Sequence, residues 1–519
     1  MGNSGKGWMT RLRAPRRANI VYRRPSGQGR NLLMKSLRVL PALVCAGLVS
    51  ACSFAPKYHT PDLPMPKEFT VAASDSVIAD RWWTAFNDAA LDSLVAEALR
   101  NNQDLAAAAA RVEQARAIAG VAKSALYPEI NVTGVASRTQ LPEGTAVGRD
   151  NPANFFGLLG NISYELDFWG KLRNANKAAR NAMLATEEGR RNVELSMISA
   201  VINTYFDLLA TDRQLAVSRS TSDSRKESAR LQRLRYEAGS ISQLDLSQAE
   251  AELAAAEATV PVFERNARQT ENALCVLVGR IGGTIERGKD GAEIDSIASP
   301  NIPVGLPSKL IARRPDVLGA EYAMIGANAN IGAARANYLP SIGLTGFGGW
   351  ESTDLSQLIT KHTDVWQISG NILQNIFAPG KVQRQVDLAW GDYRETLANY
   401  IRSVQQGFAD VEDALVARRT NVLIRAAEDR EVASRDTARK LAQIRYDAGE
   451  SSYIEVLDAQ RQLFQAQLLQ VQARNIELSA FVQLYQALGG GFQTDEMIKQ
   501  RHHIAGEAPQ ETRPGVQEH

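Results

Sequence analysis

The segment Ile118-Ala-Gly-Val-Ala-Lys-Ser-Ala-Leu-Tyr-Pro128-Glu-Ile-Asn-Val-Thr-Gly134 occurs twice in the chain. Its second copy, 212 residues later, is Asn330-Ile-Gly-Ala-Ala-Arg-Ala-Asn-Tyr-Leu-Pro340-Ser-Ile-Gly-Leu-Thr-Gly346. Two further pairs recur at a spacing of 210 residues: Gly170-Lys171 with Gly380-Lys381, and Arg235-Tyr-Glu-Ala-Gly239 with Arg445-Tyr-Asp-Ala-Gly449. A fixed period of this kind indicates a duplicated structural unit. We expect a first repeat over 88–299 and a second over 300–491, joined by the Gly/Pro-rich linker Gly279 to Pro315.

Each repeat contains a long stretch without proline, from Lys171 to Tyr236 and from Lys381 to Tyr446. These stretches are rich in Ala, Leu, Gln, Glu and Arg, which favour helices, and a helix of that length would extend about 100 Å. After the second stretch, positions spaced by four and three form a coiled-coil-like seam with two polar exceptions, Arg461 and Asn475. The seam consists of Leu457, Arg461, Phe464, Leu468, Val471, Asn475, Leu478, Val482 and Tyr485. The matching helix of the first repeat contains Pro261, which should kink or divide it.

Alternation with a period of two predicts four strands between the helices. They lie at about 128–168 and 340–377, two in each repeat, and each has one apolar face. The clearest runs through Phe156, Leu158, Gly160, Ile162, Tyr164, Leu166 and Phe168. Aromatic residues near the strand ends are typical of a membrane interface. They are Tyr164, Phe168, Trp169, Trp350, Trp366 and Phe377.

Four strands cannot close on themselves in a bilayer. Every backbone N–H and C=O in hydrocarbon must be paired, and the smallest transmembrane barrels have about eight strands. Two chains would supply eight strands and three would supply twelve, and only the larger barrel is expected to leave an open lumen. Soluble one-faced sheets are the commoner meaning of such alternation, so this interpretation depends on the membrane address below.

The N-terminus has the pattern of an export signal. Residues 1–51 contain ten Lys or Arg and no Asp or Glu, and the apolar run Val39 to Val49 follows Met34-Lys-Ser-Leu-Arg38. A charged region, a short apolar region and small residues before a cleavage site define a signal peptide. We interpret Met34 as the true initiator and residues 1–33 as an over-long gene start.

Val49-Ser-Ala-Cys52 resembles the bacterial lipobox, in which the Cys thiol receives a lipid. The alternative is an ordinary cleavage site with an incidental Cys. Ser53, rather than Asp, follows Cys52, which by the same resemblance implies sorting to the outer membrane. We therefore expect 52–87 to be a lipidated N-terminal segment and Cys275 to be the one remaining thiol, unable to form an intrachain disulfide.

Charge and composition exclude several function classes. The chain has 519 residues, 59 basic and 57 acidic, and removal of 1–51 leaves a net charge of −8, a poor basis for binding nucleic acid. Three Cys and five scattered His give no metal-ligand pattern, and no catalytic arrangement or phosphate-binding Gly loop is present. His502-His503 falls in the polar stretch 492–519, which we predict to be a disordered tail. We expect no cofactor, no metal and no enzymatic activity.

Several ordered segments resemble the TolC-like outer-membrane factors, specifically the NodT-type, OprM-like lipoproteins of RND efflux pumps. They are Trp82-Trp83-Thr-Ala-Phe86-Asn-Asp88, Asn101-Asn-Gln-Asp-Leu105, Tyr164-Glu-Leu-Asp-Phe-Trp-Gly170, Gly305-Leu-Pro-Ser308 and Arg313-Arg-Pro-Asp-Val317. The resemblance implies a mixed α and β membrane protein: a homotrimeric, twelve-stranded transmembrane β-barrel continued by a long periplasmic α-helical barrel. It also implies a passive exit duct for drugs or other small toxic compounds, working with a periplasmic adaptor and an inner-membrane RND transporter.

The resemblance further implies a gated periplasmic aperture. Tyr446 takes the position of a hydrogen-bonding tyrosine and Asp245 that of its partner, while Glu455 and Asp458 take acidic positions that would form two carboxylate rings in a trimer. Ser451 stands where a TolC-type protein has an arginine, which argues against an ionic lock to Asp245.

Two other functions fit parts of the pattern. A type I protein-secretion duct shares the fold, although the lipobox and Arg313-Arg-Pro-Asp316 favour small-molecule efflux. A periplasmic coiled-coil scaffold lipoprotein without a pore would explain the seam and Cys52 but not the paired strands.

Overall fold

A computed structural model describes residues 54–64, 81–142, 150–287, 293–300 and 313–490. The chain divides into two compact units, 1–52 and 53–519, and all described residues belong to the second. The signal peptide, Cys52 and the tail predicted above lie outside the described residues.

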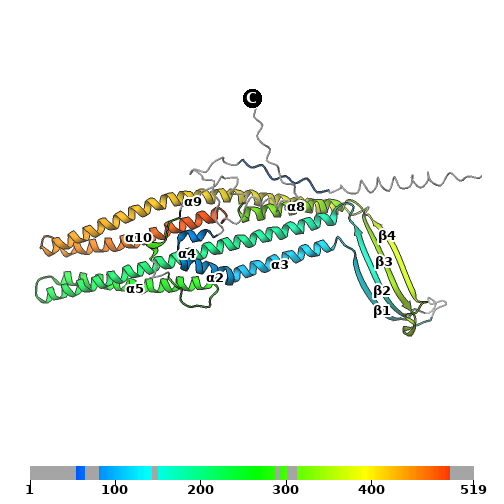
Figure 1. Cartoon of the computed structure of the whole chain (residues 1–519), viewed down its shortest axis with the longest axis horizontal. Coiled ribbons are helices and arrows are strands. Elements are labelled where there is room, and N and C mark those ends of the chain that lie inside the picture. The colour runs from blue at the N-terminus through cyan, green and yellow to red at the C-terminus, as the bar shows by residue number, and fades with distance from the viewer. Residues whose placement is uncertain (1–53, 65–80, 143–149, 288–292, 301–312, 491–519) are drawn as a thin grey trace, which may run out of the picture. The chain divides into compact units, whose positions relative to one another are not determined.

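The second unit repeats one order of elements twice (Figure 1). The first repeat contains α3 (Gln103–Ser124), β1 (Glu129–Thr139), β2 (Ala153–Leu166), α4 (Lys171–Glu237) and α5 (Gln243–Leu277). The second contains α8 (Pro315–Ala336), β3 (Ser341–Ser352), β4 (Asp364–Leu373), α9 (Lys381–Asp447) and α10 (Tyr453–Ala487). Corresponding helices have equal lengths, 22, 67 and 35 residues. The predicted duplication and the very long helices are confirmed.

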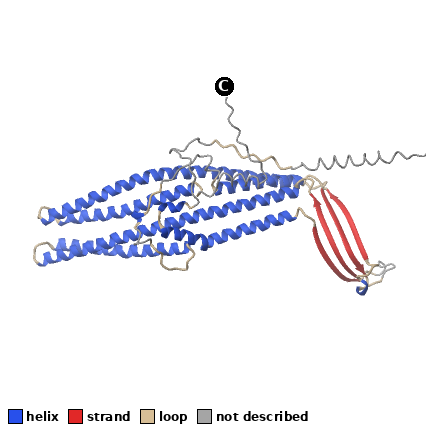
Figure 2. Ribbon diagram, viewed as in Figure 1, coloured by secondary structure: helices blue, strands red, loops and turns tan. Residues whose placement is uncertain are grey.

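Short elements complete the described chain. They are η1 (Trp82–Phe86), α2 (Ala89–Asn101), η2 (Ile294–Ser296) and η3 (Leu355–Gln357). The helices and the sheet occupy separate regions of this unit, so that α4 and α9 each begin beside the sheet and run away from it (Figure 2).

The four strands form one antiparallel sheet in the order β1-β2-β3-β4. The pairing of β2 with β3 joins the two repeats, with Leu158 opposite Trp350. Ile130 pairs with Ile162, Ile162 with Gly346 and Gly346 with Ile368, so even-numbered positions share one face across the whole sheet. This is the predicted apolar face.

Among the residues that the structure describes, no layer covers the apolar face of the sheet. Ile130 is 74% exposed and Ile368 is 79% exposed, which water would penalise by the hydrophobic effect. The opposite face is mainly polar, and on it Asn161 Nδ2 donates to Thr133 Oγ1 at 3.1 Å. A sheet with one apolar and one polar face suits a barrel wall between lipid and an aqueous lumen.

The outer strands β1 and β4 each have one edge without a strand partner in the described part of the chain. Such edges must be paired before a sheet can lie in hydrocarbon. The four strands are therefore an incomplete barrel wall that requires strands from other subunits.

The helical seam predicted on α10 is confirmed by burial. Leu457, Val471, Leu478, Val482 and Tyr485 are buried, whereas the two polar exceptions Arg461 and Asn475 are exposed and half-buried. On α5 the small residues Ala249 and Ala256 are buried at the equivalent spacing, which permits close helix approach.

The prediction that Pro261 divides α5 is wrong, because α5 continues from Gln243 to Leu277 with the proline inside it. Proline removes one N–H, which leaves the carbonyl of Glu257 without its helical donor. Both Pro261 and Glu257 are exposed, so water can satisfy that carbonyl and the helix need not end.

One large hydrophobic cluster joins η1, α2, α4, α5, α9 and α10. Trp82 stacks on Tyr485, with ring centroids 4.5 Å apart. Asp88 caps α2 through the amides of Ala90 and Leu91 and accepts a 2.9 Å hydrogen bond from the Tyr205 hydroxyl on α4. The Trp82–Asp88 motif therefore has a structural role, because its side chains fix residues 82–88 to the hydrophobic cluster and to α4.

One stretch of α4 is apolar and long enough to cross a membrane, but 61% of it is buried inside the protein. The buried apolar residues of α4 from Met197 to Ala210 belong to the hydrophobic cluster just described. We therefore assign α4 to the helical body.

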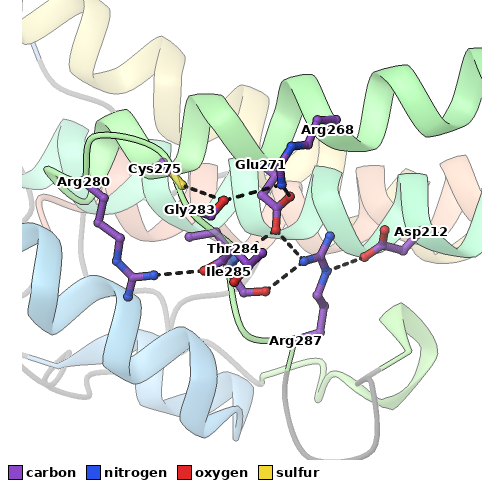
Figure 3. Close-up of polar contacts among 9 residues, drawn as sticks. All are labelled: Asp212, Arg268, Glu271, Cys275, Arg280, Gly283, Thr284, Ile285 and Arg287. Carbon is purple, nitrogen blue, oxygen red and sulfur yellow. Dashed lines mark hydrogen bonds and ion pairs between the residues drawn. The ribbon is translucent and has the colours of Figure 1, made fainter.

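The chain after α5 folds back along that helix and is held by buried Glu271 (Figure 3). Its carboxylate accepts from the Ile285 amide at 2.9 Å and from Arg287 at 2.7 Å, and Arg287 also bonds Asp212 on α4 at 2.8 Å. Burial alone would raise the pKa of Glu271, but these bonds and one from Arg268 outweigh it and lower the pKa. The beginning of the inter-repeat linker is thus fixed to both α4 and α5.

Candidate aperture at the tips of the helical hairpins

The helices α4 and α5 form one hairpin, and α9 and α10 form a second. Each turn uses a glycine with positive φ, Gly239 at +69° and Gly449 at +74°, a conformation that other residues rarely adopt. Ser240 N–H bonds the Arg235 carbonyl and Glu450 N–H bonds the Arg445 carbonyl, which closes both helix ends in the same way. The repeated Arg-Tyr-acid-Ala-Gly motif is therefore a helix-ending motif at the two tips.

Asp245 caps its own helix. Ser242 and Asp245 form a capping box at the start of α5, with Ser242 Oγ accepting from the Asp245 amide at 3.2 Å. The Asp245 carboxylate accepts from the Ser242 hydroxyl at 2.8 Å and from the Ser242 amide at 3.3 Å. Within the described single chain it makes no bond to Tyr446.

Tyr446, on the last turn of α9, instead donates its hydroxyl hydrogen to Gln232 Oε1 on α4, at 3.2 Å. Its ring lies 5.1 Å from the ring of Tyr453, the first residue of α10. Within the single chain Tyr446 thus connects the two hairpins through Gln232, and its predicted pairing with Asp245 stays a prediction.

Arg235 of α4 makes two further contacts between the hairpins. Its guanidinium lies 5.3 Å from the ring centroid of Tyr446 and 3.3 Å from the carboxylate of Asp447. A cation over an aromatic face and an ion pair are each worth roughly 0.5–1 kcal/mol at exposed sites. The sequence contained a signal for this role, because Arg235 begins the duplicated motif.

The acidic residues Glu455 and Asp458 lie on α10 and are exposed in the single chain. Each has a cationic neighbour: Arg445 lies 3.1 Å from Glu455, and Arg461 lies 3.3 Å from Asp458. The predicted carboxylate rings would therefore be partly neutralised by arginines of the same hairpin.

Arg461 explains one exception in the helical seam. Besides Asp458, it approaches Glu252 on α5 at 3.8 Å, and Glu252 accepts a 2.9 Å bond from Arg225 on α4. Burial lowers the pKa of the Arg225 guanidinium, and the nearby Glu252 opposes that shift. This ion cluster supports the first hairpin just above the tip, and sequence reasoning missed it because its members come from three helices.

Ser451 supplies no cation to the tip, because serine is uncharged. Its hydroxyl is buried without a hydrogen-bond partner in the part of the chain that the structure describes. Among the same residues, no three His, Cys, Asp or Glu side chains gather closely enough to hold a metal ion.

The family model for outer membrane efflux proteins matches residues 94–280 and 306–490, one match for each repeat. The chain is similar to the cation efflux system protein CusC of Escherichia coli, with 34% identity over 466 residues that cover 89% of this chain and all of CusC. It is similar to the toluene efflux pump outer membrane protein TtgC of Pseudomonas putida, with 33% identity covering 89% of this chain and 96% of TtgC.

Solved structures agree. A crystal structure of CusC superposes with a TM-score of 0.77 at 33% identity, covering 84% of this chain and all of that one. The Campylobacter jejuni CmeC outer membrane channel gives 0.79 at 28% identity, covering 88% and 98%. The open state of the Neisseria gonorrhoeae MtrE channel gives 0.78 at 29% identity, covering 85% and 99%.

The incomplete barrel wall and the long paired helices define one wall of a trimeric outer-membrane channel with a large periplasmic portion. The chain belongs to the outer membrane efflux protein family, whose members work within tripartite efflux pumps. The predicted family, fold class and efflux function are confirmed, and the scaffold alternative without a pore is wrong because this family forms channels.

Proposed function

We propose that this protein is the passive exit duct of an RND-type pump for small toxic compounds, and that it carries out no chemistry itself. The observation that carries the proposal is the incomplete barrel wall, apolar on one face and polar on the other, continued by two hairpins whose tips hold exposed carboxylates. Energy for transport would come from the inner-membrane RND transporter, with a periplasmic adaptor between the two.

Sequence similarity does not select the cargo. The chain is 34% identical to a cation efflux protein and 33% identical to toluene and antibiotic efflux proteins. Because these figures are nearly equal, we infer that transporter and adaptor choose the compound and that the duct offers a generic polar wall. A type I secretion duct is the weaker alternative, since the relatives named here are efflux proteins.

Cys52 is the proposed lipid attachment site, on the strength of Val49-Ser-Ala-Cys52. Several acyl chains on one residue hold a protein at a membrane far more firmly than a single chain. Cys52→Ser should abolish metabolic palmitate labelling, and labelling that persists in this variant would exclude the assignment.

The proposed gate is the tip cluster of Tyr446, Glu455, Asp458 and Asp245. In the single chain Tyr446 contacts the first hairpin through Gln232 and Arg235, and the two carboxylates of α10 are exposed. We propose that these contacts hold the hairpins together, and that carboxylates gathered around the trimer axis favour cations and oppose closure by like-charge repulsion.

The test has two parts. Deletion of the gene should sensitise the strain to several small compounds without blocking export of a large protein; the reverse pattern would favour a secretion duct. Purified trimers should conduct ions in planar bilayers, weakly until the tip is loosened. Absence of conductance even in an Arg235→Ala and Tyr446→Phe double variant, which removes contacts between the hairpins, would contradict an open lumen.

A further inference from the structure

The N-terminal segment 54–64, here called the strap, is an extended chain that belongs to no helix or strand. At least four hydrogen bonds join it to α8, one of them between Thr60 and Glu321. Arg335 donates to the Phe54 carbonyl at 3.3 Å, Asn328 donates to the Pro56 carbonyl at 2.9 Å, and the Tyr58 hydroxyl donates to Glu321 at 3.3 Å.

These three contacts have a regular spacing. The strap residues are two apart, and their partners Arg335, Asn328 and Glu321 are seven apart, which is close to two helical turns. Alternate residues of an extended chain point the same way, and residues seven apart on a helix share a face. The strap therefore lies along one face of α8, antiparallel to it and in a single register.

Gly332 lies on this face and allows the strap to approach the helix. A Cβ at this position would lie 2.7 Å from the Ala55 Cβ, 2.8 Å from the Ala55 Cα and 2.7 Å from Asn174 Nδ2 of α4, closer than real Cβ atoms come to other atoms. A glycine inside a helix is less favourable than an alanine. By contrast, a Cβ at Gly391 of α9 would meet nothing within 4 Å.

Tyr58 anchors the strap between both repeats. Tyr58 packs against two clusters of buried residues. One contains Leu184 of α4 with Leu318, Tyr322 and Ile325 of α8, and the other contains Met324 of α8 and Tyr400 of α9. Glu321, which accepts from Tyr58, is 8% exposed, and burial raises its pKa. The hydrogen bond between Tyr58 and Glu321 is therefore largely shielded from water.

We propose that the face of α8 from Glu321 to Arg335 is a docking track that fixes the register of the N-terminal strap, with Gly332 as the position that admits it. The strap then leaves the helical body at Phe54, beside the end of α8 that leads into β3. Cys52 precedes Phe54 by two residues in the sequence, so the docked strap fixes the point on α8 from which the chain leads to the proposed anchor. The proposed purpose of the track rests on the proposed lipid at Cys52, whereas the docking of the strap on α8 does not depend on it.

The experiment uses the full-length protein as purified trimers in detergent and limited trypsin digestion. Lys57 is exposed but lies between the Pro56 and Tyr58 contacts, so cleavage after it requires the strap to leave α8. Gly332→Leu should accelerate cleavage at Lys57 at least tenfold, while the matched Gly391→Leu should leave it unchanged. Equal cleavage in both variants and the parent would overturn the docking track.

A second pair of variants covers the case in which Gly332→Leu fails to assemble. Tyr58→Phe with Asn328→Ala removes two strap bonds and should accelerate cleavage about fivefold. One glycine inserted between Pro56 and Lys57 should do the same by breaking the register, whereas one inserted after Pro64 should not. Protection that survives the first insertion would overturn a fixed register.

The purpose of the track is tested separately. Gly332→Leu should reduce drug resistance of a complemented deletion strain at least fourfold. In a Cys52→Ser background, the addition of Gly332→Leu should cause no further loss of resistance. Faster cleavage at Lys57 with undiminished resistance would contradict the proposed purpose of the track. Failure of Cys52 to carry lipid would overturn the proposed anchor while the digestion result still decides the docking.

Discussion

The two hairpins have the same backbone and different tip chemistry. Both consist of helices of 67 and 35 residues joined by a turn with a positive-φ glycine. In the first, Asp245 is the third residue of α5 and caps it; in the second, the equivalent Glu455 leaves Ser452 without a side-chain cap and pairs with Arg445. The duplicated frame fixes the helices, and a few substituted side chains decide what each tip does.

The same contrast appears above the tips. Arg225 and Glu252 form an ion pair in the first hairpin, and the equivalent positions 210 residues later hold Arg435 and Gln462, which are hydrogen-bonded. The Arg225 side chain is 5% exposed, against 41% for Arg435. The first hairpin is thus the electrostatically braced one, and the second is less restrained at its tip.

The largest expected effect is the loss of this brace. Arg225→Ala would leave Glu252 half-buried without its main cation, at a cost of roughly 2 kcal/mol, or about 30-fold less protection in amide exchange at the ends of α4 and α5. Arg435→Ala should reduce protection at the ends of α9 and α10 about threefold at most. Equal effects would mean that the two hairpins do not differ in bracing.

Removal of the link between the hairpins should come next. Arg235→Ala abolishes the contacts with Tyr446 and Asp447, and a loss of about 1–1.5 kcal/mol corresponds to roughly tenfold more frequent opening in single-channel recordings. Arg445→Ala breaks an ion pair inside one hairpin and should change opening little. If Arg445→Ala opens the channel more than Arg235→Ala, the proposed division of roles is reversed.

Asp245 distinguishes a cap from a latch. Asp245→Ala should reduce exchange protection over 243–246 about fivefold, since a capping residue is worth about 1 kcal/mol, and should leave conductance unchanged. Glu455→Ala, at the equivalent position, should have no such effect on the start of α10. Increased conductance in Asp245→Ala would instead support a pairing with Tyr446 of another subunit.

Tyr446→Phe should raise the open probability about threefold by deleting the bond to Gln232, since one neutral hydrogen bond contributes about 1 kcal/mol or less. Tyr236→Phe, the equivalent change on the first hairpin, is the control. Unchanged recordings for Tyr446→Phe would leave Arg235 as the proposed latch.

The smallest effect is expected for the carboxylates. Glu455→Gln and Asp458→Asn should each lower cation-over-anion selectivity about twofold, because Arg445 and Arg461 already screen them. Reversal potentials in a salt gradient measure this. A loss of selectivity above tenfold would mean that the arginines turn away in the trimer.

Patterns that repeat along the sequence predicted the fold well. The 210-residue period, the alternation through Ile162 and the seam through Leu478 each depend on local spacing, and the structure follows them. Pro261 misled because the cost of a helical proline depends on whether water reaches the freed carbonyl, which only the three-dimensional exposure shows.

The tip could be predicted only in part. Tyr446 follows from the motif, but its partner Gln232 lies 214 residues away and belongs to no recognisable pattern. Asp245 was assigned to a latch although Ser242, three residues earlier, already forms a capping box with it. A local competitor for a side chain was visible in the sequence, and it decides the partner in the single chain.

The matched helix lengths impose a counting rule on evolution of this protein. Insertion or loss of seven residues in α4 and α5 alone would leave one tip about 10 Å out of level with its neighbour around the ring. Tolerated length changes should therefore occur in both repeats together and in whole heptads, so that natural variants of the duct grow or shrink by paired, quantised steps.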